Sequence, residues 1–122
     1  MDKHTLPHDH GQKGESVLEH LPSNEEFSST ALLFHQLGDT NRIRIFWILC
    51  HCEECVINLS AMINMSSPAV SHHLKQLKAA GLIVSRRDGK EVYYKAANVH
   101  KVHVLHNMIE NILSMHCCPV QD

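Results

Sequence analysis

Histidine and cysteine are the residues of this sequence with the greatest capacity for chemistry. The 122 residues include 12 histidines and five cysteines. Neutral imidazoles and thiolates bind transition metals, and histidine titrates near neutral pH, so the net charge depends on pH and on bound metal. These residues gather at positions 50–55, 100–106 and 116–118, which are therefore the candidate metal-binding segments.

The first segment contains Cys50, His51, Cys52 and Cys55. Thiolates combined with an imidazole suit Zn(II) or Cd(II), and three sulfurs also suit As(III). Cys52 and Cys55 are the predicted metal ligands here, and Cys50 is a further candidate for binding thiophilic metalloids. In the competing interpretation, Cys50 packs in the core and the other two cysteines bind nothing.

The second segment carries three histidines on an expected helix. His100 and His103 are three residues apart and share a helical face, and His106 lies one turn further on. Together with His116 they are predicted ligands for Zn(II), Ni(II) or Co(II), and Glu110 is a candidate to orient them. A single histidine on a helix is more often a polar surface or interface residue, and this alternative stays open.

Cys117 and Cys118 are adjacent thiols near the end of the sequence. Adjacent thiolates can bind As(III) or Cd(II), and thiols can also respond to oxidants or persulfides. The alternative is a frayed end of the last helix with exposed thiols. Residues 119–122 are expected to form a short tail.

Positive charge is concentrated in one part of an otherwise acidic chain. Lys and Arg number 11 and Asp and Glu 13, yet residues 64–95 hold six of the basic residues and two of the acidic ones. This excess predicts contact with DNA, because Lys and Arg neutralise phosphates, and such binding depends strongly on salt. A solvated surface is the alternative. The predicted DNA-contacting residues are Ser67, Ser71, His72, His73, Lys75, Gln76, Lys78, Arg86, Arg87 and Lys90.

The hydrophobic pattern predicts mainly helices around these segments. Residues 1–23 are polar and aperiodic, which predicts a mobile, histidine-bearing N-terminal arm. We expect helices over residues 27–37 and 43–49, the second one buried and capped by Asp39, and a last helix over residues 98–118. The folded domain is therefore expected over residues 24–118.

Two short helices joined by a tight turn are predicted in the middle of the chain. A helix over residues 56–63 is followed by a break at Asn64, and Ser66 can cap a second helix that Gly81 ends. This is the helix-turn-helix pattern. A recognition helix presents polar and basic side chains to the major groove, and the second helix carries such side chains on its outer face.

A β-hairpin is predicted directly after the second helix. The β-prone residues 82–84 and 91–94 flank Asp88-Gly89, a dipeptide typical of tight hairpin turns. Basic residues beside this turn would reach the DNA backbone or the minor groove. The expected fold class is mainly α with a small β-hairpin, a winged helix-turn-helix.

Four motifs follow one another through residues 37–94. They are Leu37-Gly38-Asp39-x-x-Arg42-Ile43-Arg44-Ile45, Cys55-Val56-x-Asn58-Leu59, Ser66-x-x-Ala69-Val70-Ser71-His72-His73-Leu74-x-x-Leu77-x-x-Ala80-Gly81-Leu82-Ile83, and Arg87-x-Gly89-x-x-Val92-Tyr93-Tyr94. In this order they resemble the ArsR–SmtB family of metal-responsive repressors, over roughly residues 28–116. The resemblance implies a homodimer whose last helices pair antiparallel. It also implies binding to double-stranded operator DNA, expected to be an inverted repeat, and release by an inducer, usually a metal ion.

The resemblance also implies where metal is sensed on the helix-turn-helix. Cys55 matches the first cysteine of the family's Cys-Val-Cys motif, whereas Ile57 replaces the second. The partner's N-terminal arm often completes this site in the family, which makes His4, His8 and His10 candidate ligands.

The family's second site lies on the last helix, where this chain departs from the pattern. Of the four usual ligand positions only His100 matches, and the others hold Asn98, Asn111 and Ser114. The family's pairing register would instead bring His106 near its own symmetry mate. A sulfur-sensing branch of the family pairs a cysteine on the second helix with one near the end of the last helix. Cys50 with Cys117 or Cys118 matches this pair only loosely, because Trp47 stands at the position aligned with the second-helix cysteine.

Other classes of protein find little support in the sequence. It contains no glycine-rich phosphate loop, HExxH motif or nucleophile elbow, so we expect no enzyme and no catalytic residues. No apolar run approaches the roughly 18–20 residues of a membrane span, and the first residues do not resemble a signal peptide, so we expect a cytoplasmic protein with reduced thiols and no membrane partner.

The sequence therefore predicts a metal-responsive DNA-binding repressor. We rank Zn(II) first as the bound ion, before Cd(II) or As(III), and then Ni(II) or Co(II). One alternative is a repressor of the same fold that responds to thiol oxidation or reactive sulfur. Another is a metal-binding or buffering module without regulatory DNA binding.

Overall fold

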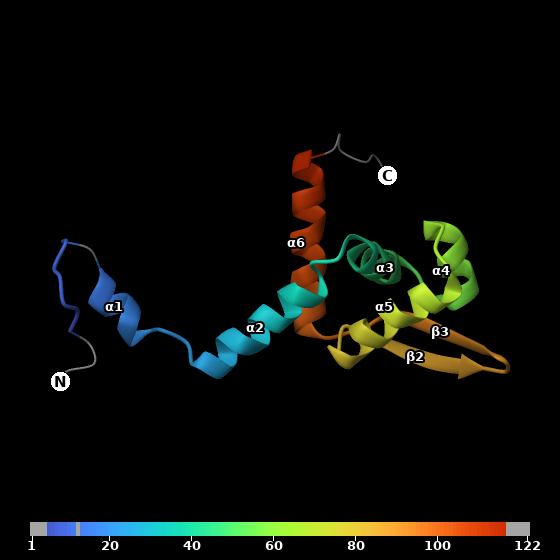
Figure 1. Ribbon diagram of the computed structural model, residues 1–122, viewed down its shortest axis with the longest axis horizontal. Coiled ribbons are helices and arrows are strands. Elements are labelled where there is room, and N and C mark those ends of the chain that lie inside the picture. Colours follow the sequence, from blue (N-terminus) through green and yellow to red (C-terminus); the bar gives the residue numbers. More distant parts are fainter. Residues whose placement is uncertain (1–4, 12, 117–122) are drawn as a thin grey trace. The chain divides into compact units, whose positions relative to one another are not determined.

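The computed structural model describes residues 5–11 and 13–116, and its helices and strands follow one another as in Figure 1. The elements of this described part are α1 (Gly14–Glu19), α2 (Asn24–Gln36), α3 (Thr40–His51), β1 (Glu54–Cys55), α4 (Val56–Ile63), α5 (Ser67–Ala79), β2 (Ile83–Asp88), β3 (Glu91–Ala96) and α6 (His100–His116). Within it, no helix is both long and apolar enough to span a bilayer.

The chain divides into two compact units, residues 1–32 and residues 33–122. The first unit holds α1, which occupies residues that we expected to lack periodic structure. Glu15, Leu18 and Glu19 favour a helix there, although none of the α1 side chains is buried. The second helix begins at Asn24 instead of residue 27, because Ser23 and Glu26 form a capping box: the Glu26 amide donates to Ser23 Oγ at 3.1 Å and the Ser23 amide to Glu26 Oε1 at 3.2 Å.

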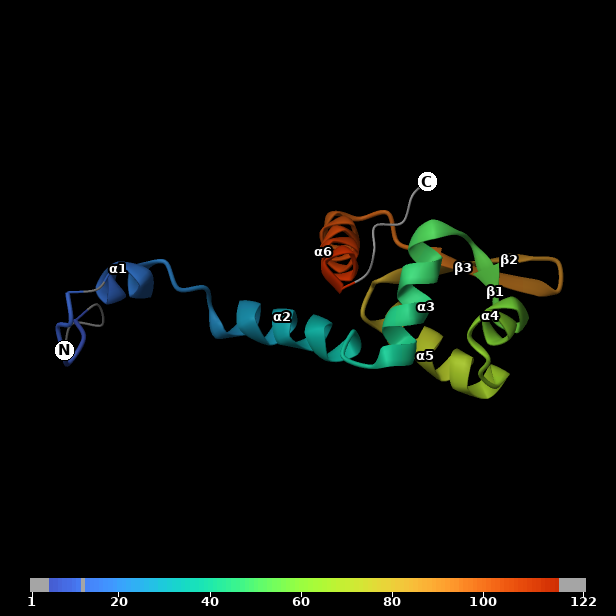
Figure 2. The same cartoon turned by 90° about the horizontal axis from the view of Figure 1, so that it is seen from above.

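A buried apolar core holds the second unit together. The fully buried side chains are Ile45, Phe46, Leu59, Val70, Leu74, Leu77, Leu82 and Ile83. Helix α3 is central, since it lies between α6 and α4 in both views (Figures 1 and 2) and packs against α5 and β3 as well. Asp39 caps α3 as predicted, accepting a hydrogen bond from the Arg42 amide at 2.9 Å.

The predicted helix-turn-helix is confirmed in α4 and α5. Helix α4 ends at Ile63, and Asn64 after it adopts the left-handed conformation (φ 55°) that makes the tight break. Ser66 then caps α5 by accepting a hydrogen bond from the Ala69 amide at 3.3 Å. Gly81 follows α5 with φ 75°, a backbone conformation that a side chain would strain.

The wing is also confirmed, and it is larger than expected. Strands β2 and β3 pair antiparallel from Ile83↔Ala96 to Asp88↔Glu91, so the hairpin begins at the expected residues but extends further along both strands. A third strand, β1, was not predicted from the sequence because it is only two residues long. It pairs Cys55 with Tyr93 and gives the strand order β1-β3-β2, which ties the start of α4 to the wing.

Candidate DNA-binding surface and histidine cluster

The outer face of α5 presents most of the predicted DNA contacts to solvent. Ser71, His72 and Lys75 are exposed, and Gln76 is partly exposed. Within the part of the chain that the structure describes, no hydrogen bond or ion pair from another residue engages these four side chains. Burial of Val70, Leu74 and Leu77 on the opposite face fixes this orientation, because these residues repeat at helical spacing.

Two further residues of α5 are exposed but already have polar partners. Ser67 Oγ lies 3.2 Å from Ser60 Oγ on α4, across the helix-turn-helix joint. Lys78 Nζ donates to Ser85 Oγ on β2 at 2.7 Å. Both contacts fix the orientation of α5 relative to its neighbours, and the Lys78 ammonium remains accessible to an approaching phosphate.

His73 does not lie on the outer face, and the expectation that it does was wrong. Its exposed fraction is 8%, because it follows Val70 by three residues and precedes Leu77 by four and so shares their buried side. The Arg42 guanidinium donates to His73 Nδ1 at 3.2 Å, and Asp39 lies 3.8 Å from Nε2. Burial lowers the pKa of His73, although the Asp39 carboxylate acts in the opposite direction. His73 therefore links α5 to the start of α3.

The three wing residues predicted to contact DNA differ in how strongly other residues of the protein bind them. Arg86 donates to both carboxylate oxygens of Glu53, at 2.9 and 2.6 Å, and its guanidinium lies 4.8 Å from the ring centroid of Tyr93. The hydrogen bond to Glu53 raises the pKa of Arg86, and that from Arg86 lowers the pKa of Glu53. Arg86 thus joins the loop after α3 to the wing. Arg87 and Lys90 are exposed, and within the described residues neither side chain has a hydrogen bond or ion pair.

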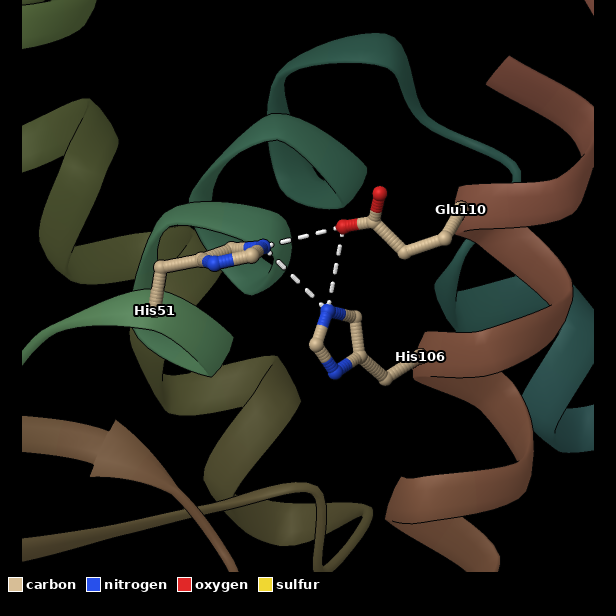
Figure 3. Close-up of side chains that lie close together, drawn as sticks. All are labelled: His51, His106 and Glu110. Carbon is tan, nitrogen blue, oxygen red and sulfur yellow. Dashed lines mark hydrogen bonds and ion pairs between the residues drawn. The ribbon is translucent and has the colours of Figure 1, made fainter. Parts of the chain in front are cut away.

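A cluster of two histidines and one carboxylate joins the end of α3 to α6 (Figure 3). His51 Nε2 lies 2.9 Å from Glu110 Oε1, and His106 Nε2 lies 3.1 Å from the same oxygen. The two Nε2 atoms are 3.2 Å apart. We call these three residues the histidine cluster; among the described residues, they are the one group of three or more His, Cys, Asp and Glu ligand atoms close enough to hold a metal ion.

Trp47 completes the surroundings of the histidine cluster. Its indole Nε1 donates to Glu110 Oε1 at 2.8 Å, and its ring centroid lies 4.2 Å from that of His51. Hydrogen bonds from His51, His106 and Trp47 lower the pKa of Glu110, so this side chain is a carboxylate at neutral pH. The indole also fixes which carboxylate oxygen faces the two imidazoles.

Of the predicted histidine ligands, the structure joins His106 to this cluster. His106 is a member, whereas His103 Nε2 lies 2.8 Å from Asn98 Oδ1 and His100 is exposed at the first turn of α6. His116 is the last residue of α6, and Cys117 and Cys118 lie outside the described residues. His4 also lies outside them, and His8 and His10 belong to the first unit.

The predicted thiol ligands do not enter the cluster either. Cys50, Cys52 and Cys55 are free thiols, and Cys55 is held in β1. Burial, and to a smaller extent the negative charge of Glu110, raises the pKa of Cys50 to about 11. Burial and Glu54 also raise the pKa of Cys52. Because the thiolate is both the nucleophile and the ligand, Cys50 and Cys52 are poorly activated in this structure.

All three members of the histidine cluster were singled out in the sequence, but they were not predicted to form one site. Glu110 was expected only to orient other ligands, and His51 was grouped with its cysteine neighbours. The local spacing reveals the pair His106 and Glu110, which are four residues apart on one helix. His51 is 55 residues from His106, and no local pattern could have shown that contact.

Known proteins are similar to this chain in sequence. The pattern described as bacterial regulatory protein, arsR family, matches residues 39–85. The chain is 34% identical over 96 residues to the cadmium resistance transcriptional regulatory protein CadC of Listeria innocua, covering 75% of this chain and 81% of that protein. It is 30% identical to the transcriptional repressor SmtB homolog of Synechocystis, covering 84% and 78% of the two chains.

A solved structure extends this similarity to the fold. The homodimeric winged helix-turn-helix domain Mb0332 of Mycobacterium bovis, described as a possible ArsR-family transcriptional regulator, superposes with a TM-score of 0.67 at 24% identity, covering 78% of this chain and 90% of that one. This chain is therefore a winged helix-turn-helix protein and belongs to the arsR family of bacterial regulatory proteins.

Proposed function

We propose that this chain is a transcriptional repressor that binds operator DNA and is released from it by a metal ion. The observation that carries the proposal is the outer face of α5, where Ser71, His72 and Lys75 are exposed and unengaged within the described residues. The naming of relatives as a cadmium resistance regulator and a transcriptional repressor supports both parts of the proposal.

In this proposal, α5 enters the major groove and the wing lies against the backbone. Ser71, His72 and Gln76 would meet base edges, while Lys75 and Lys78 would neutralise phosphates. Ser71 has an alternative, which is a hydrogen bond to the backbone one turn earlier. On the wing, Arg87 and Lys90 are the residues available to phosphates, and Ser67 and Arg86 would contribute mainly by holding α5 and the hairpin in place.

The operator-binding form is proposed to be a homodimer. Val104, Ile112, Leu113 and Met115 on α6 are 43–81% exposed, which is a large apolar surface for one helix. A second copy of the chain would cover it and would place two recognition helices on successive turns of an inverted repeat. The homodimeric relative supports this arrangement.

The releasing ion is proposed to bind histidines of α6, with Zn(II) ranked first. His100, His103 and His106 all lie on this helix, and their imidazoles suit borderline divalent ions. Cys52 and Cys55 remain the thiolate alternative, with Cys50, Cys117 and Cys118 as candidates for metalloids or reactive sulfur. The raised pKa values of Cys50 and Cys52 weigh against reaction of these free thiols with reactive sulfur in the metal-free chain.

Fluorescence anisotropy of reduced, metal-free protein on DNA from its own upstream region tests the proposal. Zn(II), Cd(II), Ni(II), Co(II) and As(III) are added separately at fixed salt. We expect tight, salt-dependent binding and release at near-stoichiometric Zn(II), with an affinity loss of about 5- to 150-fold. Binding that no ion affects would refute the metal response, and failure to bind any such duplex at low salt would refute the repressor.

A further inference from the structure

The histidine cluster has the dimensions of a metal-binding site. In a tetrahedral zinc site with Zn–N bonds of about 2.0–2.1 Å, neighbouring ligand atoms lie about 3.3–3.4 Å apart. The three ligand atoms of His51, His106 and Glu110 are separated by 2.9, 3.1 and 3.2 Å. They therefore already form a triangle close in size to one face of such a tetrahedron, and binding requires only a small expansion.

Protons alone cannot satisfy all three contacts of this triangle. If both imidazoles carry a hydrogen on Nε2, the two nitrogens meet as donors 3.2 Å apart. If only one carries this hydrogen, the lone pair of the other Nε2 points at a lone pair of the Glu110 carboxylate oxygen. That oxygen also accepts the indole hydrogen of Trp47 at 2.8 Å. A cation between the three atoms satisfies every lone pair at once, with Trp47 holding the carboxylate in position.

We propose that His51, His106 and Glu110 bind a borderline divalent metal ion, with Zn(II) or Co(II) as the fitting ions. Two imidazoles and a carboxylate suit these ions, and the cluster contains no sulfur to favour Cd(II) or As(III). The site is formed within one chain by two helices. It includes none of the positions that match the family's last-helix pattern.

A pocket of about 300 Å³ lies beside the cluster. His51 and His106 both line this pocket, together with Cys50, Cys52 and His103. Three protein ligands with an open position allow water to complete the tetrahedron, as in other three-ligand zinc sites.

The position of the site suggests how metal would act on DNA binding. It ties the C-terminal end of α3 to α6, the helix proposed to form the dimer. Helix α3 also packs against the recognition helix α5. Metal would therefore restrict the angle between the DNA-binding part and the dimer helix. This consequence rests on the proposed function, whereas metal binding itself does not.

Trp47 provides a direct and specific readout because it is the one tryptophan of the chain. Reduced, metal-free protein is titrated with Zn(II) without DNA, following Trp47 fluorescence and competition with a chromophoric chelator. A change in fluorescence that saturates at one ion per chain is expected. Co(II) should give the visible absorption of a tetrahedral site, without the near-ultraviolet sulfur-to-metal band of a thiolate site.

His106→Gln and Glu110→Gln test the assignment of the ligands. Each should weaken Zn(II) binding at the Trp47 site by at least about tenfold, since even indirect supports of a metal ligand cost that much. Glu110→Gln retains an amide oxygen for the Trp47 hydrogen bond, so its effect does not depend on lost packing. His35→Gln, an exposed histidine of α2, is the matched control and should bind Zn(II) like the parent chain.

Three results would overturn the site. The first is Zn(II) binding that leaves Trp47 fluorescence unchanged. The second is a parental affinity for Zn(II) in His106→Gln and Glu110→Gln. The third is loss of Zn(II) binding in the double variant His100→Gln with His103→Gln, while those two variants still bind.

The anisotropy experiment separates this site from the proposed function. If the chain does not bind DNA but Zn(II) still changes Trp47 fluorescence, the repressor proposal fails and the metal site stands; if DNA binding responds to Zn(II) but Trp47 does not, the reverse holds.

Discussion

The outer face of α5 and the histidine cluster both combine histidine with charged side chains, yet they are organised in opposite ways. On α5, the described residues leave the side chains of Ser71, His72 and Lys75 unengaged. In the cluster, His51, His106 and Glu110 point at one another and share a single carboxylate oxygen. A surface that binds a large partner keeps its polar groups free, whereas a site for one ion gathers its ligands beforehand.

Helix α3 connects the two regions. Its buried side packs against α5, and its last residue supplies one imidazole of the cluster. A change in the core of α3 should therefore damage both regions, whereas a change on the outer face of α5 should damage only one.

The largest effect is expected for Phe46→Ala. Phe46 is the largest fully buried side chain, and its removal leaves a cavity in α3. We expect the free energy of unfolding to fall by about 3–5 kcal/mol, measured by urea denaturation, with loss of both DNA binding and the Zn(II)-dependent change in fluorescence. Ile57→Ala, at a 68% exposed position of α4, is the control and should stay within about 0.5 kcal/mol of the parent.

Lys75→Ala should separate the two regions. Lys75 is exposed on α5 and is proposed to neutralise one phosphate. DNA affinity should fall at every operator sequence, and the slope of log affinity against log salt should become less steep by about 0.9. Lys13→Ala removes the same charge outside residues 64–95 and should leave that slope unchanged. An unchanged slope in Lys75→Ala would remove this residue from the interface.

A smaller effect on stability is expected at the start of α5. Ser66 Oγ accepts a hydrogen bond from the Ala69 amide, and Ser66→Ala leaves that amide without its cap. The free energy of unfolding should fall by about 1 kcal/mol, measured by urea denaturation. Ser66→Asp should restore most of it, since aspartate is also a good N-cap. If Ser66→Asp is no more stable than Ser66→Ala, the cap does not stabilise this helix.

The comparison also explains what the sequence could and could not predict. The helix-turn-helix and wing were predictable because caps, turns and helical periodicity act over a few residues, and Ser66, Asn64 and Gly89 all mark such features. The histidine cluster was not, since His51 and Glu110 are 59 residues apart and meet only through the packing of α3 on α6. The same limit applies to Arg86, whose partner Glu53 is 33 residues away.

The position of His73 was predicted wrongly for a different reason. Its polar character suggested the outer face of α5, whereas helical spacing from Val70 and Leu77 places it inside. There it faces Arg42 and Asp39, with His72 as its neighbour on α5. Burial lowers the pKa of His73 in the folded chain below the ordinary value of 6.5.

Because the pKa of His73 is lower in the folded state, the unfolded chain binds a proton first as the pH falls. The contribution of His73 to stability is therefore complete above its ordinary pKa and is lost as the pH falls through the lowered folded value. Urea denaturation between about pH 7.5 and pH 5.5 should show a fall in stability that is shallower in His73→Gln. His72→Gln, at the exposed neighbouring position, should retain the parental fall. A constant difference between His73→Gln and the parent at every pH would mean that His73 acts through packing and its bond with Arg42, and not through its protonation.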